Sequence, residues 1–192
     1  MSLSEPVAKI VEANSNGLLG AHHSWERVLL SRVASVQNGF AFPSDAFRKN
    51  EGFPLIRIRD IMRGSTDTGF VGDFDAAYIV EPGDLIVGMD GDFNSTIWNG
   101  PPGLLNQRVC RIISDNRFLD LRFLAYALPG YLNAVNAATS AITVKHLSSR
   151  SIEQIPLPLP PSLSSAGSWP RSRRNSHGSM RRWRRLSEQG RV

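Results

Sequence analysis

Short runs in which apolar and polar residues alternate are the most regular pattern in the first two thirds of this chain. Such alternation predicts strands that bury one face and expose the other. The run from Leu85 to Met89 is apolar throughout, so it predicts a strand that is buried on both faces. Turn-forming pairs such as Asn38-Gly39 separate the runs. The predicted strands cover residues 25–30, 53–59, 78–80, 85–89, 96–98 and 108–113.

Helical spacing of apolar residues follows this region. Asp120 is the predicted N-cap of a helix, and the pair Pro129-Gly130 is expected to interrupt that helix before helical spacing resumes. A shorter helix is expected from Ser31 to Val36, and residues 152–161 are expected to form an edge strand rich in proline. Strands first and helices later predict an α+β fold, with a mixed, mainly antiparallel sheet and helices in the C-terminal part of a single domain.

Charge and composition divide the chain into three segments. Residues 1–24 are predicted to be a leader with one helical signal, Val7 to Ala13. Residues 25–161 are predicted to form the only compact domain. Residues 162–192 hold eight of the 22 basic residues and one of the 17 acidic residues, so this tail carries a net charge of +7 and the rest of the chain carries −2. The tail has neither heptads nor a core pattern, and we expect it to be disordered.

Several classes of function are not supported by the sequence. No apolar run is long enough to span a membrane and no signal peptide is visible, which predicts a cytoplasmic protein. Cys110 is the only cysteine, which excludes an internal disulfide or a cysteine-rich zinc site and predicts a plain buried thiol. The segment Asp90-Gly-Asp-Phe-Asn94 lacks the glycine and glutamate of a calcium loop. Phosphate-binding, nucleophile-elbow and zinc-hydrolase motifs are missing, so we expect no enzymatic activity, no metal and no cofactor.

Polar side chains that suit DNA recognition cluster in and beside the predicted strands. Alternation over residues 53–59 predicts that Arg57 and Arg59 point outward, while Ile56 and Ile58 pack inward. Amides pair with adenine, carboxylates accept from cytosine, and basic or hydroxyl side chains contact phosphates. The predicted DNA contacts are Arg57, Arg59, Asp60, Asp90, Asp92, Asn94, Asn106, Gln107, Arg108, Lys145 and Ser148.

Structural alternatives remain open for these residues. Arg57, Arg59 and Arg108 would be unavailable to DNA if they paired with Asp60, Asp84 or Asp92 as surface ions. Residues 90–94 would equally suit a loop that only turns the chain. The polar segment that holds Thr143, Lys145, His146 and Ser148 would look the same if it were a solvated turn.

Six motifs in a fixed order carry a family resemblance. They are Trp25-x-x-Val-x-Leu, Asn38-Gly-Phe-Ala-Phe-Pro-Ser, Pro54-Leu-Ile-Arg-Ile-Arg-Asp-Ile, Gly83-Asp-Leu-Ile-Val-Gly, Leu105-Asn-Gln-Arg-Val and Ile155-Pro-Leu-Pro-Leu-Pro-Pro. Over residues 25–161 this order resembles the target recognition domain of Type I restriction-modification specificity subunits. The resemblance implies a domain that binds double-stranded DNA and reads one half of a split site. It also implies partnership with methyltransferase subunits and, through the complex, with the nuclease subunit, while self-association stays open.

The chain departs from the family pattern after residue 161. Specificity subunits carry two recognition domains separated by long helices, whereas this chain shows one domain and no heptad-bearing helix. The composition of residues 162–192 is that expected of a segment translated out of frame. An alternative reading is therefore a truncated, non-functional remnant of a specificity subunit. A third reading treats the arginines of the tail as a nucleic-acid-binding arm.

Overall fold

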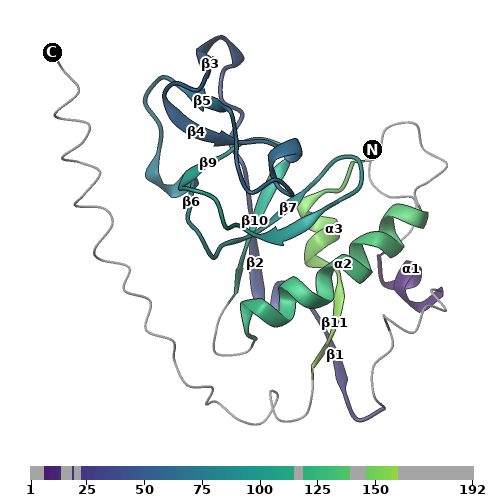
Figure 1. Cartoon of the computed structure of the whole chain (residues 1–192). Helices are drawn as coiled ribbons and strands as arrows, with labels where there is room; N and C mark the ends of the chain where they lie inside the picture. The colour runs from purple at the N-terminus through teal and green to yellow at the C-terminus, as the bar shows by residue number, and fades with distance from the viewer. Residues whose placement is uncertain (1–6, 14–18, 20–22, 115–118, 139–145, 160–192) are drawn as a thin grey trace, which may run out of the picture.

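The computed structural model describes residues 7–13, 19, 23–114, 119–138 and 146–159. The basic tail at residues 162–192 and the predicted contact Lys145 lie outside these ranges. Within them, the chain forms three sheets and three α-helices (Figure 1). The α+β class with mixed, mainly antiparallel strands is confirmed, although the strands divide among three sheets.

A four-stranded antiparallel sheet forms the middle layer, in the order β2, β10, β7, β8. These strands are β2 (Ala34–Asn38), β10 (Val109–Ser114), β7 (Leu85–Gly88) and β8 (Ser95–Ile97). All residues of β7 are buried, as its apolar run predicts. Because alternate side chains face opposite sides of a strand, Leu85 and Val87 enter one core cluster and Ile86 enters another. The sheet is therefore packed on both faces.

The second layer is a five-stranded sheet in the order β3, β5, β4, β9, β6. Its strands are β3 (Phe47–Lys49), β5 (Thr68–Phe70), β4 (Phe53–Ile56), β9 (Gly103–Leu105) and β6 (Ile79–Val80). Neighbours in this sheet are antiparallel except β4 and β9, which are parallel with Leu55 opposite Leu104. Ile56 and Leu105 share a buried cluster with Ile86 of the middle sheet. This cluster holds the two sheets together.

Arg111 of β10 adds a polar link between the same two sheets. Its guanidinium donates to Gln37 Oε1, to the carbonyl oxygens of Ala77 and Ile79 (3.0 and 2.7 Å), and to Asp84 Oδ2 (2.9 Å). The side chains of Arg111 and Asp84 are only 15% and 13% exposed. A charged pair at this depth needs such a full set of partners to offset its desolvation.

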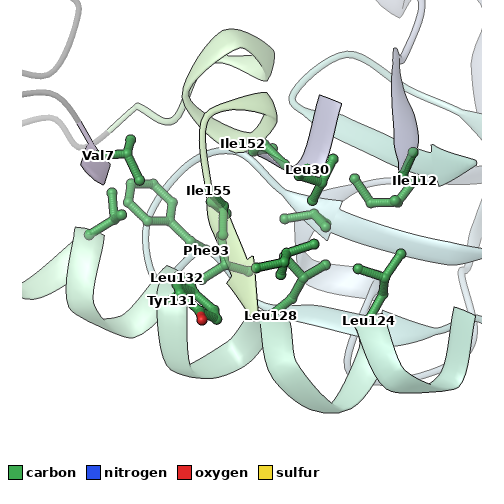
Figure 2. Packing of buried hydrophobic residues seen from close by; sticks show 14 of the residues in the cluster. Val7, Leu30, Phe93, Ile112, Leu124, Leu128, Tyr131, Leu132, Ile152 and Ile155 are labelled. Carbon is green, nitrogen blue, oxygen red and sulfur yellow. The ribbon is translucent and has the colours of Figure 1, made fainter. Parts of the chain in front are cut away.

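A two-stranded ribbon and the helices cover the other face of the middle sheet (Figure 1). The ribbon pairs β1 (Glu26–Leu29) with β11 (Pro156–Leu159) in antiparallel register, which joins the start of the predicted domain to its end. α2 (Leu121–Ala138) and α3 (Ser149–Glu153) pack into the same cluster. Figure 2 shows Leu124 and Leu128 of α2 lying against this core, with Leu30 and Ile155 opposite them.

The core also includes part of the segment that the sequence predicts to be a leader. α1 (Val7–Ala13) is helical, as expected. Its apolar residues Val7, Ile10 and Val11 recur at helical spacing and are buried in the same cluster as α2. Figure 2 shows Val7 at one end of this cluster. The packed part of the structure therefore begins well before residue 25.

Two helix predictions are wrong. α2 continues through Pro129, because Leu128 and Leu132 on either side keep their helical spacing and are buried. Their burial outweighs the hydrogen bond that the proline removes. The helix expected over Ser31–Val36 is a 3-10 turn (Leu30–Arg32) followed by β2. Pairing of β2 with β10 overrides the local capping signal there.

Cys110 is a free thiol buried in β10, as predicted. Burial raises its pKa to about 12, so the thiol stays protonated near neutral pH. Within the described ranges, no helix is both long enough and apolar enough to cross a membrane. The same ranges hold no group of three or more His, Cys, Asp or Glu side chains arranged for a metal ion.

Candidate nucleic-acid interface

An open groove of about 380 Å³ lies where β4 and β9 end. Parallel strands end at the same edge of a sheet, so the residues after Ile56 and those after Leu105 emerge side by side. The groove is lined by Arg57, Ile58, Arg59, Asn106, Gln107 and Arg108. Five of these six are predicted DNA contacts, and the fold brings them together from two separate motifs.

The first wall of the groove is a tight turn rather than the end of a strand. β4 stops at Ile56, and residues Ile58–Asp60 form a 3-10 turn, which corrects the strand predicted through Arg59. Asp60 causes the change, because its Oδ2 accepts from the backbone N–H of Arg57 (3.1 Å) while the Arg57 carbonyl accepts from the Asp60 N–H (2.8 Å). Asp60 is fully buried. Its carboxylate therefore lies beneath the two arginines instead of on the surface.

The two arginines of this turn differ in exposure. The Arg57 side chain is 23% exposed and is held by the Thr68 hydroxyl, by Asp60 Oδ2 at 3.5 Å and by Asp67 Oδ1 at 3.5 Å. The Arg59 side chain is 61% exposed and lies 4.0 Å from Asp60 Oδ1 and 3.9 Å from Asp67 Oδ1. A hydrogen bond from Thr68 lowers the pKa of Asp67, and the nearby arginines add to this effect. Arg59 is thus the more available of the two cations.

The second wall is the turn from Asn106 to Val109, closed by a bond from the Val109 N–H to the Asn106 carbonyl (3.2 Å). Gln107 is exposed, and its N–H donates to the Phe40 carbonyl (2.8 Å). Arg108 has φ of 67°, in the left-handed region that a residue other than glycine adopts at a cost. The Asn106 side chain is buried, and its Oδ1 has no hydrogen-bond partner among the described residues. Backbone strain such as that at Arg108 is concentrated at functional sites.

The polar loop between β7 and β8 lies next to this turn. Phe93 anchors it, because its ring is buried in the main core although its φ is 51° (Figure 2). The Gly88 N–H closes the loop on the Asn94 carbonyl (2.8 Å), and Gly91 supplies a φ of 72°. Asp92 and Asn94 are exposed, as a contact role requires. The loop is therefore fixed from below while its polar side chains face outward.

Asp90 joins this loop to two other segments. Its Oδ2 accepts from Arg108 (2.8 Å) and its Oδ1 bonds to His146 Nδ1 (2.6 Å). Of the ion pairs that the sequence left open, those of Arg57 and Arg59 with Asp60 are present, whereas Arg108 pairs with Asp90 instead. Ser148, another predicted contact, caps α3 by accepting from the Ser151 N–H (3.1 Å). Its hydroxyl thus has a structural role next to the same surface.

Phe40 lies beside the groove and is not among the predicted contacts. Its backbone bridges to Asn106, its ring is 46% exposed, and the ring centroid lies 5.0 Å from that of Phe42 and 5.2 Å from that of Tyr78. An exposed aromatic ring beside basic side chains is able to stack on a base. Phe40 belongs to the second of the six motifs, but its sequence context does not indicate that it lies beside the groove.

Residues 23–164 match the family described as the Type I restriction modification DNA specificity domain. This match covers most of the chain, which therefore belongs to that family, as its motifs indicate. The chain is 52% identical to the Type I restriction enzyme EcoBI specificity subunit of Escherichia coli over 162 residues, covering 84% of this chain and 34% of that subunit. It is 24% identical to the MjaVIII specificity subunit of Methanocaldococcus jannaschii over 111 residues, 58% of this chain and 26% of that one. The chain thus spans about a third or less of these relatives.

Solved structures share the fold. A chain from work on complex assembly and conformational transition of the type I R-M system superposes with a TM-score of 0.57 at 16% identity, over 81% of this chain and 39% of that chain. The HsdS subunit from Thermoanaerobacter tengcongensis superposes with a TM-score of 0.54 at 15% identity, over 81% of this chain and 38% of that subunit. At such identities the likeness establishes the fold alone.

Proposed function

We propose that this chain is a sequence-specific DNA-recognition domain that reads one half of a split site for a Type I restriction-modification complex. The observation that carries the proposal is the groove that collects Arg57, Arg59, Gln107 and Arg108 at one edge of the five-stranded sheet. Arginines and amides are the side chains that most often read base edges in the major groove. Family membership supports the same reading.

Exposure within the groove favours contact with a polyanion. Arg59 and Arg108 are 61% and 66% exposed, whereas their partners Asp60 and Asp90 are 0% and 20% exposed. The cations thus form the outer layer and two of the carboxylates lie behind them. Two exposed cations thus face outward at the groove although residues 1–161 carry a net charge of −2. We therefore expect the affinity of this domain for DNA to be modest and to depend on a partner subunit, because the domain neutralises few phosphates.

In the complex we propose that the domain directs other subunits and does no chemistry itself. A methyltransferase subunit would bind beside it, the nuclease subunit would join through that complex, and the assembly would act on cytoplasmic DNA without a cofactor held by this chain. Support comes from the family, whose description names DNA specificity. The groove offers arginines, amides and one apolar residue, which are side chains suited to binding DNA.

The test is selection of preferred duplexes from a randomised library by the full chain together with a methyltransferase subunit of a matching system. Arg59→Ala should weaken binding to the preferred duplex by about 1–3 kcal/mol and flatten the preference at one position. Lys145→Ala should weaken all duplexes alike and reduce the salt slope by about one. Binding of the wild-type chain to duplexes of unrelated sequence measures the sequence-independent contribution, to which the eight tail arginines would add.

Arg48→Ala is the matched control, because Arg48 of β3 is an exposed arginine whose guanidinium bonds, among the described residues, to the carbonyl oxygens of Asp45 and Phe47. It should leave the preferred sequence unchanged. If the wild-type chain with its partner selects no sequence at all, the recognition proposal fails, and the chain behaves as the non-functional remnant considered above.

A further inference from the structure

The carboxylate of Asp90 contacts two side chains from other parts of the sequence, those of Arg108 and His146. Arg108 donates to its Oδ2 (2.8 Å), and His146 Nδ1 lies 2.6 Å from its Oδ1. The backbone fixes this meeting point, because Asp90 and His146 form an antiparallel bridge and the Leu147 N–H donates to the Met89 carbonyl (2.7 Å). Both oxygens of Asp90 are therefore already in use.

The exposures of these three side chains assign their roles. Asp90 is 20% exposed, whereas His146 is 46% and Arg108 is 66% exposed. The carboxylate thus lies inside and the two nitrogen-bearing groups lie outside. Each carboxylate oxygen could accept a second hydrogen bond, but a base approaching from outside would meet the more exposed His146 and Arg108 first. The structure assigns it instead to positioning the other two side chains.

The chemistry of the imidazole then fixes what His146 offers to DNA. An ionised carboxylate only accepts, so Nδ1 carries the proton that is shared with Asp90. In the neutral ring Nε2 is then an acceptor, and it has no hydrogen bond to any described residue. Arg108 keeps guanidinium N–H groups that Asp90 does not use. Asp90 therefore holds an acceptor, Nε2 of His146, next to a donor, the guanidinium of Arg108.

We propose that His146 is a base-reading residue whose Nε2 accepts a hydrogen bond from the exocyclic amino group of adenine or cytosine in the major groove, and that Asp90 positions both His146 and Arg108. Those amino groups are the major-groove donors that an imidazole acceptor matches. This inference rests on the proposed DNA recognition and adds to it a further residue and the chemical class of its target.

Two substitutions of His146 test the roles of its two ring nitrogens independently. His146→Asn keeps an amide N–H near the position of Nδ1 and has no atom at the position of Nε2. His146→Gln places a carboxamide, which is able to accept, near the position of Nε2. In library selection by the full chain with its methyltransferase partner, the Asn variant should lose its preference for adenine or cytosine at one base pair, by about tenfold. The Gln variant should keep part of that preference, and Asp90→Asn should weaken it together with the preference set by Arg108.

A second measurement compares two duplexes on the same protein, so a reduced amount of folded variant affects both duplexes equally. In the preferred duplex, the base at the affected position is replaced by an analogue that lacks only the amino group. Loss of the amino group should weaken binding of the wild-type chain about tenfold and binding of His146→Asn less than about twofold. Equal losses for both proteins, or a uniform loss of affinity for all sequences in His146→Asn, would overturn the assignment. A wild-type chain that selects no sequence would overturn it together with the proposed function.

Discussion

Replacement of Arg111 by methionine should destabilise the domain more than any other single change of a surface-reaching arginine. Methionine keeps an unbranched apolar stem like that of arginine but removes every donor of the guanidinium. Asp84 would keep only the bond from the Glu81 N–H (2.9 Å). The Ala77 carbonyl oxygen would keep the bond from Gln37 Nε2 (2.9 Å) but lose that from Arg111, and the Ile79 carbonyl oxygen would lose its bond from Arg111. The link between the two larger sheets would then depend on apolar contacts alone.

The expected loss follows from burial. Breaking a buried ion pair on one side costs about 3–5 kcal/mol, because a charge is left without its partner. Since Arg111 and Asp84 are still 15% and 13% exposed, water relieves part of this cost, and we expect about 3 kcal/mol. A chain of this size loses about 2–4 °C of melting temperature per kcal/mol, so the midpoint should fall by about 6–12 °C.

Urea denaturation of the full chain, followed by circular dichroism, measures this loss. Arg48→Met is the control, because Arg48 is exposed and bonds only to local carbonyl oxygens, and it should change stability by less than about 0.5 kcal/mol. Adding Asp84→Leu to Arg111→Met removes the unpaired charge and should recover about 1–2 kcal/mol. A loss below about 1 kcal/mol for Arg111→Met, or no recovery in the double variant, would refute the reasoning.

Three further outcomes are expected from other parts of the structure. Because burial raises the pKa of Cys110 from 9.0 to about 12, the folded state holds a proton that the unfolded state loses, so the free energy of unfolding should fall as pH rises from 9 toward 12. Urea titrations across that range should show a shallower fall for Cys110→Ala. Arg108→Gly should be more stable than Arg108→Ala by about 1 kcal/mol in thermal unfolding, since only glycine adopts φ of 67° without strain; equal midpoints would argue against strain at this turn. In the same denaturation assay, Gly39→Ala should destabilise the domain by more than about 3 kcal/mol, because the new Cβ would lie 2.0 Å from the Asn106 carbonyl oxygen. Gly91→Ala should cost only about 1 kcal/mol, because its Cβ would have nothing within 4 Å and only the φ of 72° would be strained.

Local patterns predicted the elements of this fold well where burial and spacing agree. The buried strand β7 and the helix α1 follow directly from their apolar residues. The parallel pairing of β4 with β9 could not be predicted, because it joins segments far apart in sequence and the local pattern of neither segment indicates its partner. The same holds for α1, whose spacing predicts a helix but does not say that Val7 packs into the main core.

For the site, residue types could be predicted and their geometry could not. Arg57, Arg59, Gln107 and Arg108 were expected to contact DNA, and the structure collects them in one groove. Alternation suggested that the strand continues to Arg59, since period-two spacing cannot reveal that the Asp60 carboxylate accepts from the backbone and turns the chain. The contact of Asp90 with His146 likewise depends on how three segments meet. Which of these residues touch bases stays a prediction.

The two prolines of β11 have a consequence for association between copies of the chain. Pro156 and Pro158 alternate with Leu157, and the Leu30 N–H bonds to the Ile155 carbonyl (2.9 Å), so residues 155 and 157 are the ones whose backbone groups face β1. The nitrogens of Pro156 and Pro158 therefore point to the outer side of the ribbon, where they have no hydrogen to donate. A free strand from another molecule would find acceptors but no donors there. The β11 edge of the ribbon thus resists pairing with a strand of another molecule, which lowers the risk of aggregation through that edge.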